Sequence, residues 1–352
     1  MSAPTCGVAR VRSRGFTLVD VMVALAIAMA TIVLAYRTFV ALHDIGRTTV
    51  AAADAQATAA YALAAITLRT GNAGTGIRAA ARWFEQCAVD TNVGRTLRPI
   101  AAIIVDGGGG DRSDALVIRQ SLATIAVPLR IVADTPAGAP LHVEAVDGVA
   151  VGDRIAVAGG AGRCAVTDIT AIRPVSAGIV ELEHSSLTVD IPANSIVISL
   201  GPATRESTLR FDVDASTLRS TDVANGDAPS PVVSNVWLMK ALYGLDNDGD
   251  GIVDDWVGAA PASSWTAPDV LGASPAALAK IVALRIGVIA RTDRTDDRVT
   301  RSTPFVLFDC ELDDKTRCPG RIAGTVAPTS AGGYRYRALE TIVPLRNSVW
   351  TR

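Results

Sequence analysis

An apolar run near the start of the chain, residues 16–36, constrains the fold more than any other feature of this sequence. It is polar only at Thr17, Asp20 and Thr31. A helix of about 20 residues, rising about 1.5 Å per residue, matches a hydrocarbon core of about 30 Å. Three arginines precede the run, and only Arg37 follows it closely. This charge bias predicts a single membrane span with its N-terminus in the cytoplasm.

Asp20, the one acid inside the apolar run, helps to choose among three interpretations of this segment. A cleaved secretory signal peptide is disfavoured, because the run is too long and no site of small residues ends it in polar surroundings. A plain signal anchor explains the length and the charges but not Asp20. A carboxylate at the centre of a membrane helix costs roughly 2.5–3.5 kcal/mol, so Asp20 is a functional hypothesis by default. A third interpretation takes account of the residues that precede Asp20.

Residues 15–20, Gly-Phe-Thr-Leu-Val-Asp, resemble the cleavage motif of the type IV prepilins. The resemblance implies that residues 1–15 are a leader, that prepilin peptidase cuts between Gly15 and Phe16, and that the new N-terminus is methylated. The family has Glu at the fifth mature position, where this chain has the shorter Asp20. Aspartate in place of glutamate keeps the negative charge, but its side chain is one methylene shorter.

Cleavage would free an ammonium group on Phe16 inside the bilayer. Paired charges in hydrocarbon cost less than two unpaired ones. We therefore expect Asp20 to act as the assembly acid, neutralising the Phe16 amine of its own chain or of a neighbour. The alternative is that Asp20 only reaches the cytoplasmic headgroups.

Length and charge exclude some classes of protein. With 352 residues the chain can bury a sizeable core, in one large domain or two ordinary ones. The net charge of −2 does not suggest a nucleic-acid partner or a polybasic membrane surface. No second run reaches about 18 apolar residues, so one span is predicted.

The cysteines suggest disulfides on the oxidising side of the membrane. Cys6 lies in the leader, and its removal would leave an even number. Cys310 and Cys318 are close in sequence, and closing such a loop contributes about 2.5 kcal/mol in the chain-entropy model. We pair these two, and Cys87 with Cys164 by elimination. Free buried thiols are the alternative.

The sequence predicts an α+β fold. Ala-rich sequence with helical spacing at Tyr61 and Leu68 extends the first helix over residues 16–70, with 16–36 in the membrane. Gly46 is a candidate bend. The helix should pack on a β-rich domain of antiparallel strands at residues 80–352, outside the cell membrane.

The predicted strands are 100–105, 115–119, 126–133, 154–158, 165–172, 179–182, 195–200, 207–213, 232–242, 281–290, 306–308 and 339–345. A short helical piece is predicted at 275–280.

Four stretches of this region resemble PilW-like minor pilins, in the family's order. They are Ser-Asp-Ala-Leu-Val-Ile-Arg at 113–119, Gly-Asp-Arg-Ile-Ala-Val at 152–157, Tyr-Gly-Leu-Asp at 243–246, and Tyr-Arg-Tyr-Arg at 334–337 with Pro-Leu-Arg-Asn at 344–347. The family tends to have a Gly-Cys close to the helix end, whereas the nearest cysteine here is Cys87.

The resemblance implies a structural, non-catalytic minor pilin. It would sit in the inner membrane and then in the pilus at the cell surface, in an initiating complex with other minor and major pilins. Two alternatives stay open: a large minor pseudopilin of a type II secretion system, and a pilus-tip adhesin contacting surfaces or DNA.

The acidic loop at residues 246–255, Asp-Asn-Asp-Gly-Asp-Gly-Ile-Val-Asp-Asp, is the sharpest chemical motif. Acids at its first, third and fifth positions, then glycine, match the start of an EF-hand-type calcium loop. Its twelfth position is Val257 rather than the usual bidentate Glu, so an acid at 254 or 255 would have to close the shell. The predicted ligands of a calcium ion are Asp246, Asp248, Asp250, the carbonyl of Ile252, Asp254 and Asp255. The alternative is a solvated turn without metal.

No sequence motif indicates catalysis. Gly-x-Ser-x-Gly, P-loop and His-Glu-x-x-His patterns are absent from the sequence. His43, His142 and His184 lie outside any recognisable nucleophile motif, and the glycine run at 107–110 favours a flexible loop. We therefore expect the protein not to be an enzyme.

Overall fold

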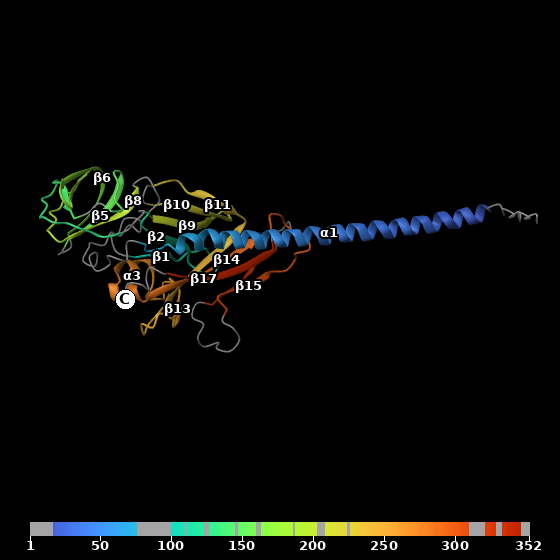
Figure 1. The fold of residues 1–352 in the computed structure, drawn as a ribbon. Helices are drawn as coiled ribbons and strands as arrows, with labels where there is room; N and C mark the ends of the chain where they lie inside the picture. Colours follow the sequence, from blue (N-terminus) through green and yellow to red (C-terminus); the bar gives the residue numbers. More distant parts are fainter. Residues whose placement is uncertain are drawn as a thin grey trace, which may run out of the picture. The chain divides into compact units, whose positions relative to one another are not determined.

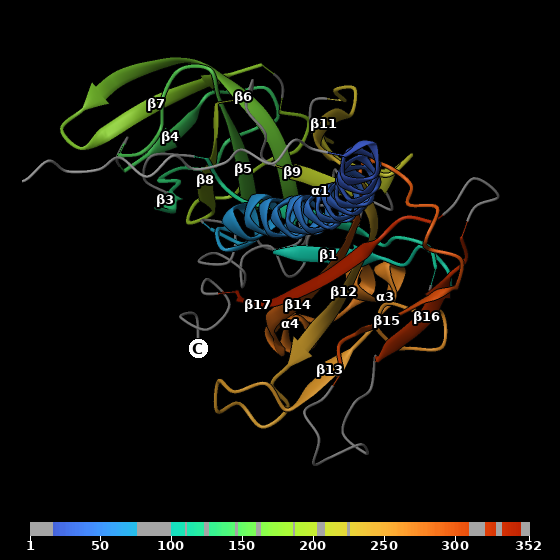
Figure 2. The ribbon, with the colours of Figure 1, turned by 90° about the vertical axis from the view of Figure 1, so that its right-hand side faces the viewer.

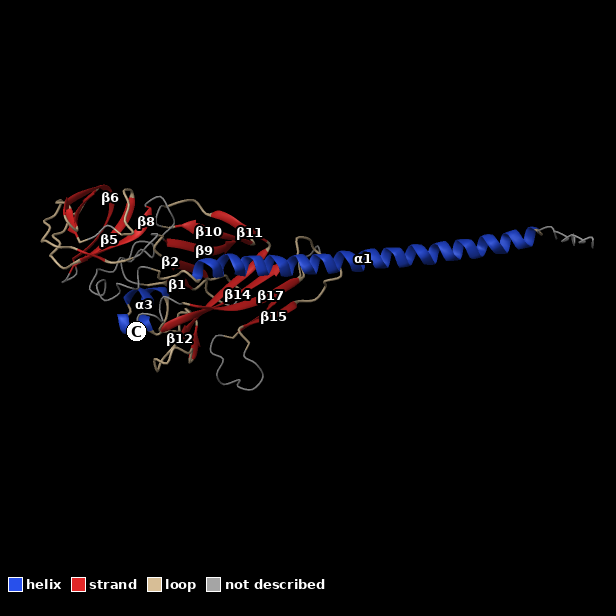
Figure 3. Cartoon of the chain, viewed as in Figure 1, coloured by secondary structure: helices blue, strands red, loops and turns tan. Residues whose placement is uncertain are grey.

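The computed structural model describes most of the chain, in two compact units of residues 1–51 and 52–352. The described residues are 17–75, 100–109, 111–122, 127–144, 147–159, 163–185, 187–202, 208–223, 226–309, 321–328 and 333–345. One long helix comes first, and most of the regular structure after it is antiparallel strand (Figure 3). This confirms the predicted α+β fold.

The long helix α1 spans Leu18–Thr70 and continues through Gly46. Ala is the strongest helix former, and the Ala-rich sequence after the apolar run sustains the helix past this glycine. After Thr70 the chain turns, and Gly74 has a positive φ of 79°. Between residues 52 and 70 the helix buries one face, formed by Ala55, Ala59, Ala62, Leu63, Ile66 and Thr70.

The described residues after the helix form four antiparallel sheets, of five, four, two and six strands (Figure 1). The five-stranded sheet has the order β1-β2-β9-β10-β11 among the described residues. Its strands are β1 (Ala102–Val105), β2 (Ala115–Arg119), β9 (Thr208–Asp214), β10 (Thr217–Asp222) and β11 (Ser230–Ser234).

The second sheet has the order β13-β12-β14-β17, and a separate pair, β15-β16, packs beside it. These strands are β12 (Val236–Leu245), β13 (Asp255–Val257), β14 (Ile281–Arg291), β15 (Thr303–Leu307), β16 (Ile322–Val326) and β17 (Tyr336–Pro344). The short helices α3 (Ala267–Gly272) and α4 (Pro275–Ala279) lie between β13 and β14 in sequence.

The main core joins the five-stranded and four-stranded sheets to the C-terminal part of α1. It contains Ile66 from the helix, Ile103 and Leu116 from the five-stranded sheet, and Met239 and Tyr243 from β12. Burial of such side chains contributes about 1.5–3 kcal/mol each, so this cluster is a main source of stability for the unit.

A six-stranded module lies between β2 and β9 in sequence. Its order is β3-β8-β5-β6-β7-β4 in the described part of the chain, and its strands gather together in Figure 2. A bridge between Ile131 and Val143 joins the two ends of this order, and Val132 N donates to His142 O over 2.9 Å. The sheet therefore closes on itself as a small barrel. The strands are β3 (Leu129–Arg130), β4 (Leu141–Val143), β5 (Asp153–Gly159), β6 (Arg163–Ser176), β7 (Ile179–His184) and β8 (Ile196–Pro202).

The barrel has its own core and is inserted into the five-stranded sheet. Alternate side chains, among them Ile155, Val157 and Leu182, fill its interior. The strands before and after the insertion pair directly, with Arg119 opposite Thr208. Apart from the insertion, β2 and β9 are paired as the two strands of an ordinary antiparallel hairpin.

The predicted strands agree with the structure except in a few places. The strand predicted at 232–242 is wrong as a single element, because Asn235 has a φ of 64° and separates β11 from β12. The sequence did not predict β4, β10, β13, β16 or α3, whereas the helical piece at 275–280 is confirmed as α4.

Candidate functional site

The start of α1 positions the predicted assembly acid. Gly15 and Phe16, the residues of the predicted cleavage site, lie outside the described residues. Thr17 N and Thr17 Oγ1 donate to Asp20 Oδ2 over 3.0 and 2.8 Å, and Asp20 N donates to Thr17 Oγ1 over 3.2 Å. This reciprocal pair is a capping box, which satisfies backbone N–H groups that the first helical turn leaves unpaired.

The helix that follows is long and apolar enough to cross a membrane, by length and composition. Within its own unit its large apolar side chains are exposed, for example Leu25, Ile32 and Leu34. A continuous exposed apolar surface of this length is unusual for a helix in water and typical of one that lies in lipid.

The acidic loop connects two paired strands, β12 and β13. Leu245 lies opposite Asp255 in the β12–β13 ladder, and Asp254 N donates to Leu245 O over 2.8 Å. At the other end of the loop, Asp246 N donates to the carbonyl of Lys280, the C-cap residue of α4, over 2.9 Å. The ends of the loop are thus fixed by backbone hydrogen bonds.

Inside the loop, the carboxylate of Asp246 organises the turn. Asp246 is buried, and its two oxygens accept from Gly249 N over 2.6 Å and from Gly251 N over 2.8 Å. Both glycines have a φ of 90°, a conformation that side-chain-bearing residues rarely adopt. The glycines at these two positions therefore let the backbone wrap around the first carboxylate.

The loop brings three of the predicted ligands together. Asp246, Asp248 and Asp254 each offer a carboxylate oxygen within 4.8 Å of the others. Carboxylate oxygens are the donors that hard cations such as Ca²⁺ prefer, so the donor set fits such an ion. Each added carboxylate also raises the mutual repulsion that a cation would relieve.

Two other predicted acidic ligands, Asp250 and Asp255, lie outside that group. Asp250 Oδ1 accepts from Ile252 N over 2.7 Å, and Asp255 Oδ2 accepts from the side-chain amide of Asn247 over 2.8 Å. Asp254, rather than Asp255, is therefore the later acid that approaches the first and third positions.

Comparison with known proteins bears on this region. Residues 205–347 match the family model PilW, described as type IV Pilus-assembly protein W. Over these residues the chain is similar to the PilW family of type IV pilus-assembly proteins. No curated protein and no solved structure matches it significantly.

The PilW match begins just before β9 and ends just after β17. It includes the acidic loop and two of the four stretches on which the resemblance was based, those at 243–246 and 334–337. The helix α1 and the inserted barrel lie outside it. In this PilW-like chain the barrel thus falls directly before the matched region.

A buried ion pair between the two sheets was not predicted from the sequence. Lys240 Nζ on β12 lies 2.7 Å from Oδ1 of Asp114, the residue directly before β2, and 3.8 Å from Asp106 Oδ1. Lys240 is 3% exposed and Asp114 is 5% exposed. Asp114 lies in the stretch 113–119 that resembles the PilW-like pilins. Its partner Lys240 lies 126 residues further along the chain, so nothing in the sequence indicated the contact.

The cysteines and histidines are placed only in part. Cys164 on β6 is disulfide-bonded. The other cysteines, Cys87, Cys310 and Cys318 among them, lie outside the described residues. The pairings of Cys87 with Cys164 and of Cys310 with Cys318 therefore stay predictions.

The three histidines lie in different environments. His43 stacks on Phe39 along α1, His142 Nε2 lies 3.5 Å from Glu181, and His184 Nε2 lies 2.9 Å from the carbonyl oxygen of Ala139.

Proposed function

We propose that this PilW-like chain is a structural, non-catalytic minor pilin that takes part in type IV pilus assembly and initiation. It is made as a prepilin, cleaved by prepilin peptidase between Gly15 and Phe16, and methylated on Phe16. Its helix holds it in the inner membrane with the N-terminus in the cytoplasm until it enters the pilus. The observation that carries the proposal is the combination, on one chain, of the apolar helix α1 and the PilW-like β region.

The geometry at the start of α1 supports a role for Asp20 after cleavage. Thr17, the residue that would follow the new N-terminal amine, already donates its N–H to the Asp20 carboxylate. Cleavage would place an ammonium group one residue away. A charge-assisted contact between that ammonium and Asp20 could form within one chain or between neighbouring pilins. It would lower the free-energy cost of placing the two charges in hydrocarbon.

Processing is tested by replacing the residue before the predicted cut. Gly15→Val should block cleavage and leave a precursor heavier by the leader, whereas Gly7→Val, a matched change within the leader, should be processed normally. Mature-sized protein from Gly15→Val would contradict the prepilin assignment. Loss of pili in a strain lacking the chain would support the assembly role over an adhesin role.

We further propose that the acidic loop binds calcium through Asp246, Asp248 and Asp254, with a structural role outside the cell membrane. When bound, the ion would offset the repulsion between these carboxylates and order the β12–β13 connection. The clustering of the three carboxylates supports the proposal.

Calcium binding is tested by titrating the full chain, in detergent, with calcium and with magnesium. We expect heat and a higher melting temperature with calcium. We expect a weaker response to magnesium, which demands stricter octahedral geometry and loses its water reluctantly. No heat and no change in melting temperature with calcium would contradict the proposal.

A further inference from the structure

We propose that Lys240 and Asp114 form an intramolecular amide bond that covalently links β12 to the chain directly before β2. The inference concerns the core of the second unit and does not depend on the pilin assignment. It rests on the distance between the two groups, their isolation from water, the backbone donors aimed at the Asp114 carboxyl, and a second acid beside the lysine.

The two reacting groups are held in contact. Lys240 Nζ lies 2.7 Å from Asp114 Oδ1, and the side chains are 4% and 6% exposed. The surrounding core holds both strands in place through Met239, Ala241 and Leu116, all of which are buried. Fixing two reactants in such proximity replaces a bimolecular encounter by an effectively unimolecular step.

Burial favours the protonated carboxyl group that the reaction needs. A carboxylate pays a large desolvation penalty in a core, and taking up a proton from the neighbouring ammonium gives a carboxylic acid and a neutral amine. Desolvation raises the pKa of Asp114 against the opposing effect of Lys240. A neutral amine is a nucleophile, and a protonated carboxyl group is a better electrophile than a carboxylate.

Two backbone N–H groups are aimed at the carboxyl group that would be attacked. Gly107 N donates to Asp114 Oδ1 over 3.2 Å, and Ala241 N donates to Asp114 Oδ2 over 3.1 Å. Donors so placed stabilise the negative charge that develops on oxygen in a tetrahedral intermediate. The approach of Gly107 requires glycine, because a Cβ there would lie 2.0 Å from the carbonyl oxygen of Ser113.

A second acid, Asp106, lies beside the lysine and can transfer protons during the reaction. Asp106 Oδ1 lies 3.8 Å from Lys240 Nζ, and the Asp106 side chain is 18% exposed. It lies within reach to accept a proton from the attacking nitrogen after a small movement, and to return it to the departing oxygen.

The step balances without a co-reactant. Lys240 Nζ attacks Asp114 Cγ and forms a C–N bond. Asp106 takes the proton that the nitrogen loses and delivers it to the leaving hydroxyl. The C–O bond breaks, one water molecule leaves, and Asp106 ends in its starting state. Nothing is oxidised or reduced.

Peptide mapping of the full chain tests the bond directly. The purified protein is denatured, reduced and digested with trypsin, which does not cut after an acylated lysine. We expect residues 113–119 linked to residues 220–280, with the combined mass lower by one water and with no cut after Lys240. Finding the separate peptides 113–119, 220–240 and 241–280 as the main products would overturn the proposal.

Variants separate the reacting residues from bystanders. Lys240→Arg keeps the charge but cannot form this amide, so the linked peptide should vanish, whereas Lys280→Arg should retain it. Asp106→Asn should lower the linked fraction several-fold at a fixed time after synthesis. An unchanged fraction in Asp106→Asn would overturn the role given to that acid. The mass of the unaltered protein decides the main question even where a variant fails to fold.

Discussion

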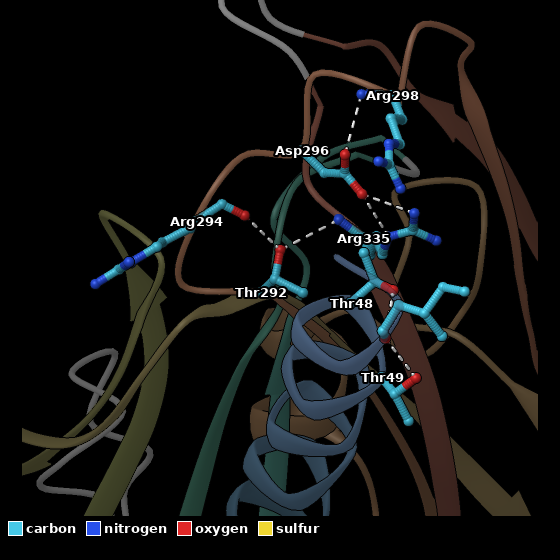
Figure 4. A network of polar contacts seen from close by, with 8 residues as sticks. Thr48, Thr49, Thr292, Arg294, Asp296, Arg298 and Arg335 are labelled. Carbon is cyan, nitrogen blue, oxygen red and sulfur yellow. Dashed lines mark hydrogen bonds and ion pairs between the residues drawn. The ribbon is translucent and has the colours of Figure 1, made fainter. Parts of the chain in front are cut away.

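Arg335 Nη2 lies 2.7 Å from Asp296 Oδ2, and this ion pair fastens the loop between β14 and β15 to the chain leading into β17 (Figure 4). Arg335 Nε donates to the same oxygen over 3.0 Å, and Arg298 N donates to Asp296 Oδ1 over 3.0 Å. Thr292 Oγ1 accepts from Arg335 N over 3.3 Å. The Asp296 carboxylate and the Thr292 hydroxyl thus both hold this charged loop against the chain that leads into β17.

The ion pair predicts a pH-dependent contribution to stability. The hydrogen bond from Arg335 holds the pKa of Asp296 below its ordinary value. The contribution is therefore present above the unfolded-state pKa of about 3.9 and is lost as the pH falls through the lower folded-state pKa. Asp296→Asn should cost at most about 1 kcal/mol at pH 7, and the difference from wild type should shrink in acid. Denaturant unfolding at several pH values measures this.

Asp293→Asn is the matched control for that change. Asp293 is exposed, and its carboxylate lies 3.7 Å from Arg294, so its loss should be nearly neutral throughout. Equal effects of the two substitutions would contradict the role given to Asp296.

Tyr243 ties the two sheets together through a buried hydroxyl. Ile104 N donates to Tyr243 Oη over 2.5 Å, and Tyr243 is fully buried. Tyr243→Phe should destabilise the protein by about 1–3 kcal/mol, because the Ile104 N–H loses its partner away from water. Thermal unfolding checks this against Tyr61→Phe, which changes an exposed side chain and should be neutral. A neutral Tyr243→Phe would show that the N–H finds another partner.

The buried face of α1 predicts a contrast between two neighbouring apolar residues. Ile66 is 0% exposed and belongs to the main core, whereas Leu68 is 72% exposed. Ile66→Ala should cost about 2–5 kcal/mol, and Leu68→Ala should stay within about 0.5 kcal/mol. Reversal of this order in denaturant unfolding would mean that α1 packs through a different face.

The acidic loop predicts unequal effects for two of its acids. Asp248→Asn removes one of the three clustered carboxylates, so calcium affinity should fall at least about tenfold, or about 1.4 kcal/mol. Asp255→Asn changes an acid outside the group and should have a smaller effect. Calorimetry on both variants measures the difference. A larger loss in Asp255→Asn would place the ion elsewhere in the loop.

Features with a local signal could be predicted from the sequence. The apolar run and the Ala-rich sequence after it predict α1, and alternate acids with glycines predict a loop in which three carboxylates converge. The helical face was not predictable, because Ala-rich sequence is apolar on every side: the spacing at Tyr61 and Leu68 marks a helix, yet both side chains are exposed.

Features that depend on distant contacts could not be predicted. The barrel closes through a bridge between Ile131 and Val143, and neither residue carries a signal for that pairing. The contact between Asp114 and Lys240 spans 126 residues, and in sequence each reads as an ordinary charged residue. The separation of β11 from β12 depends on a positive φ at Asn235. Asparagine tolerates this conformation, but its presence in a sequence does not predict it.

Mass spectrometry of the mature N-terminus tests the pilin assignment most directly. The chain is isolated from the membranes of cells that have prepilin peptidase, and its N-terminal peptide is sequenced. We predict a first residue of Phe16 carrying one methyl group on its amine. A chain that keeps residues 1–15, or one cut after the apolar run, would contradict the assignment.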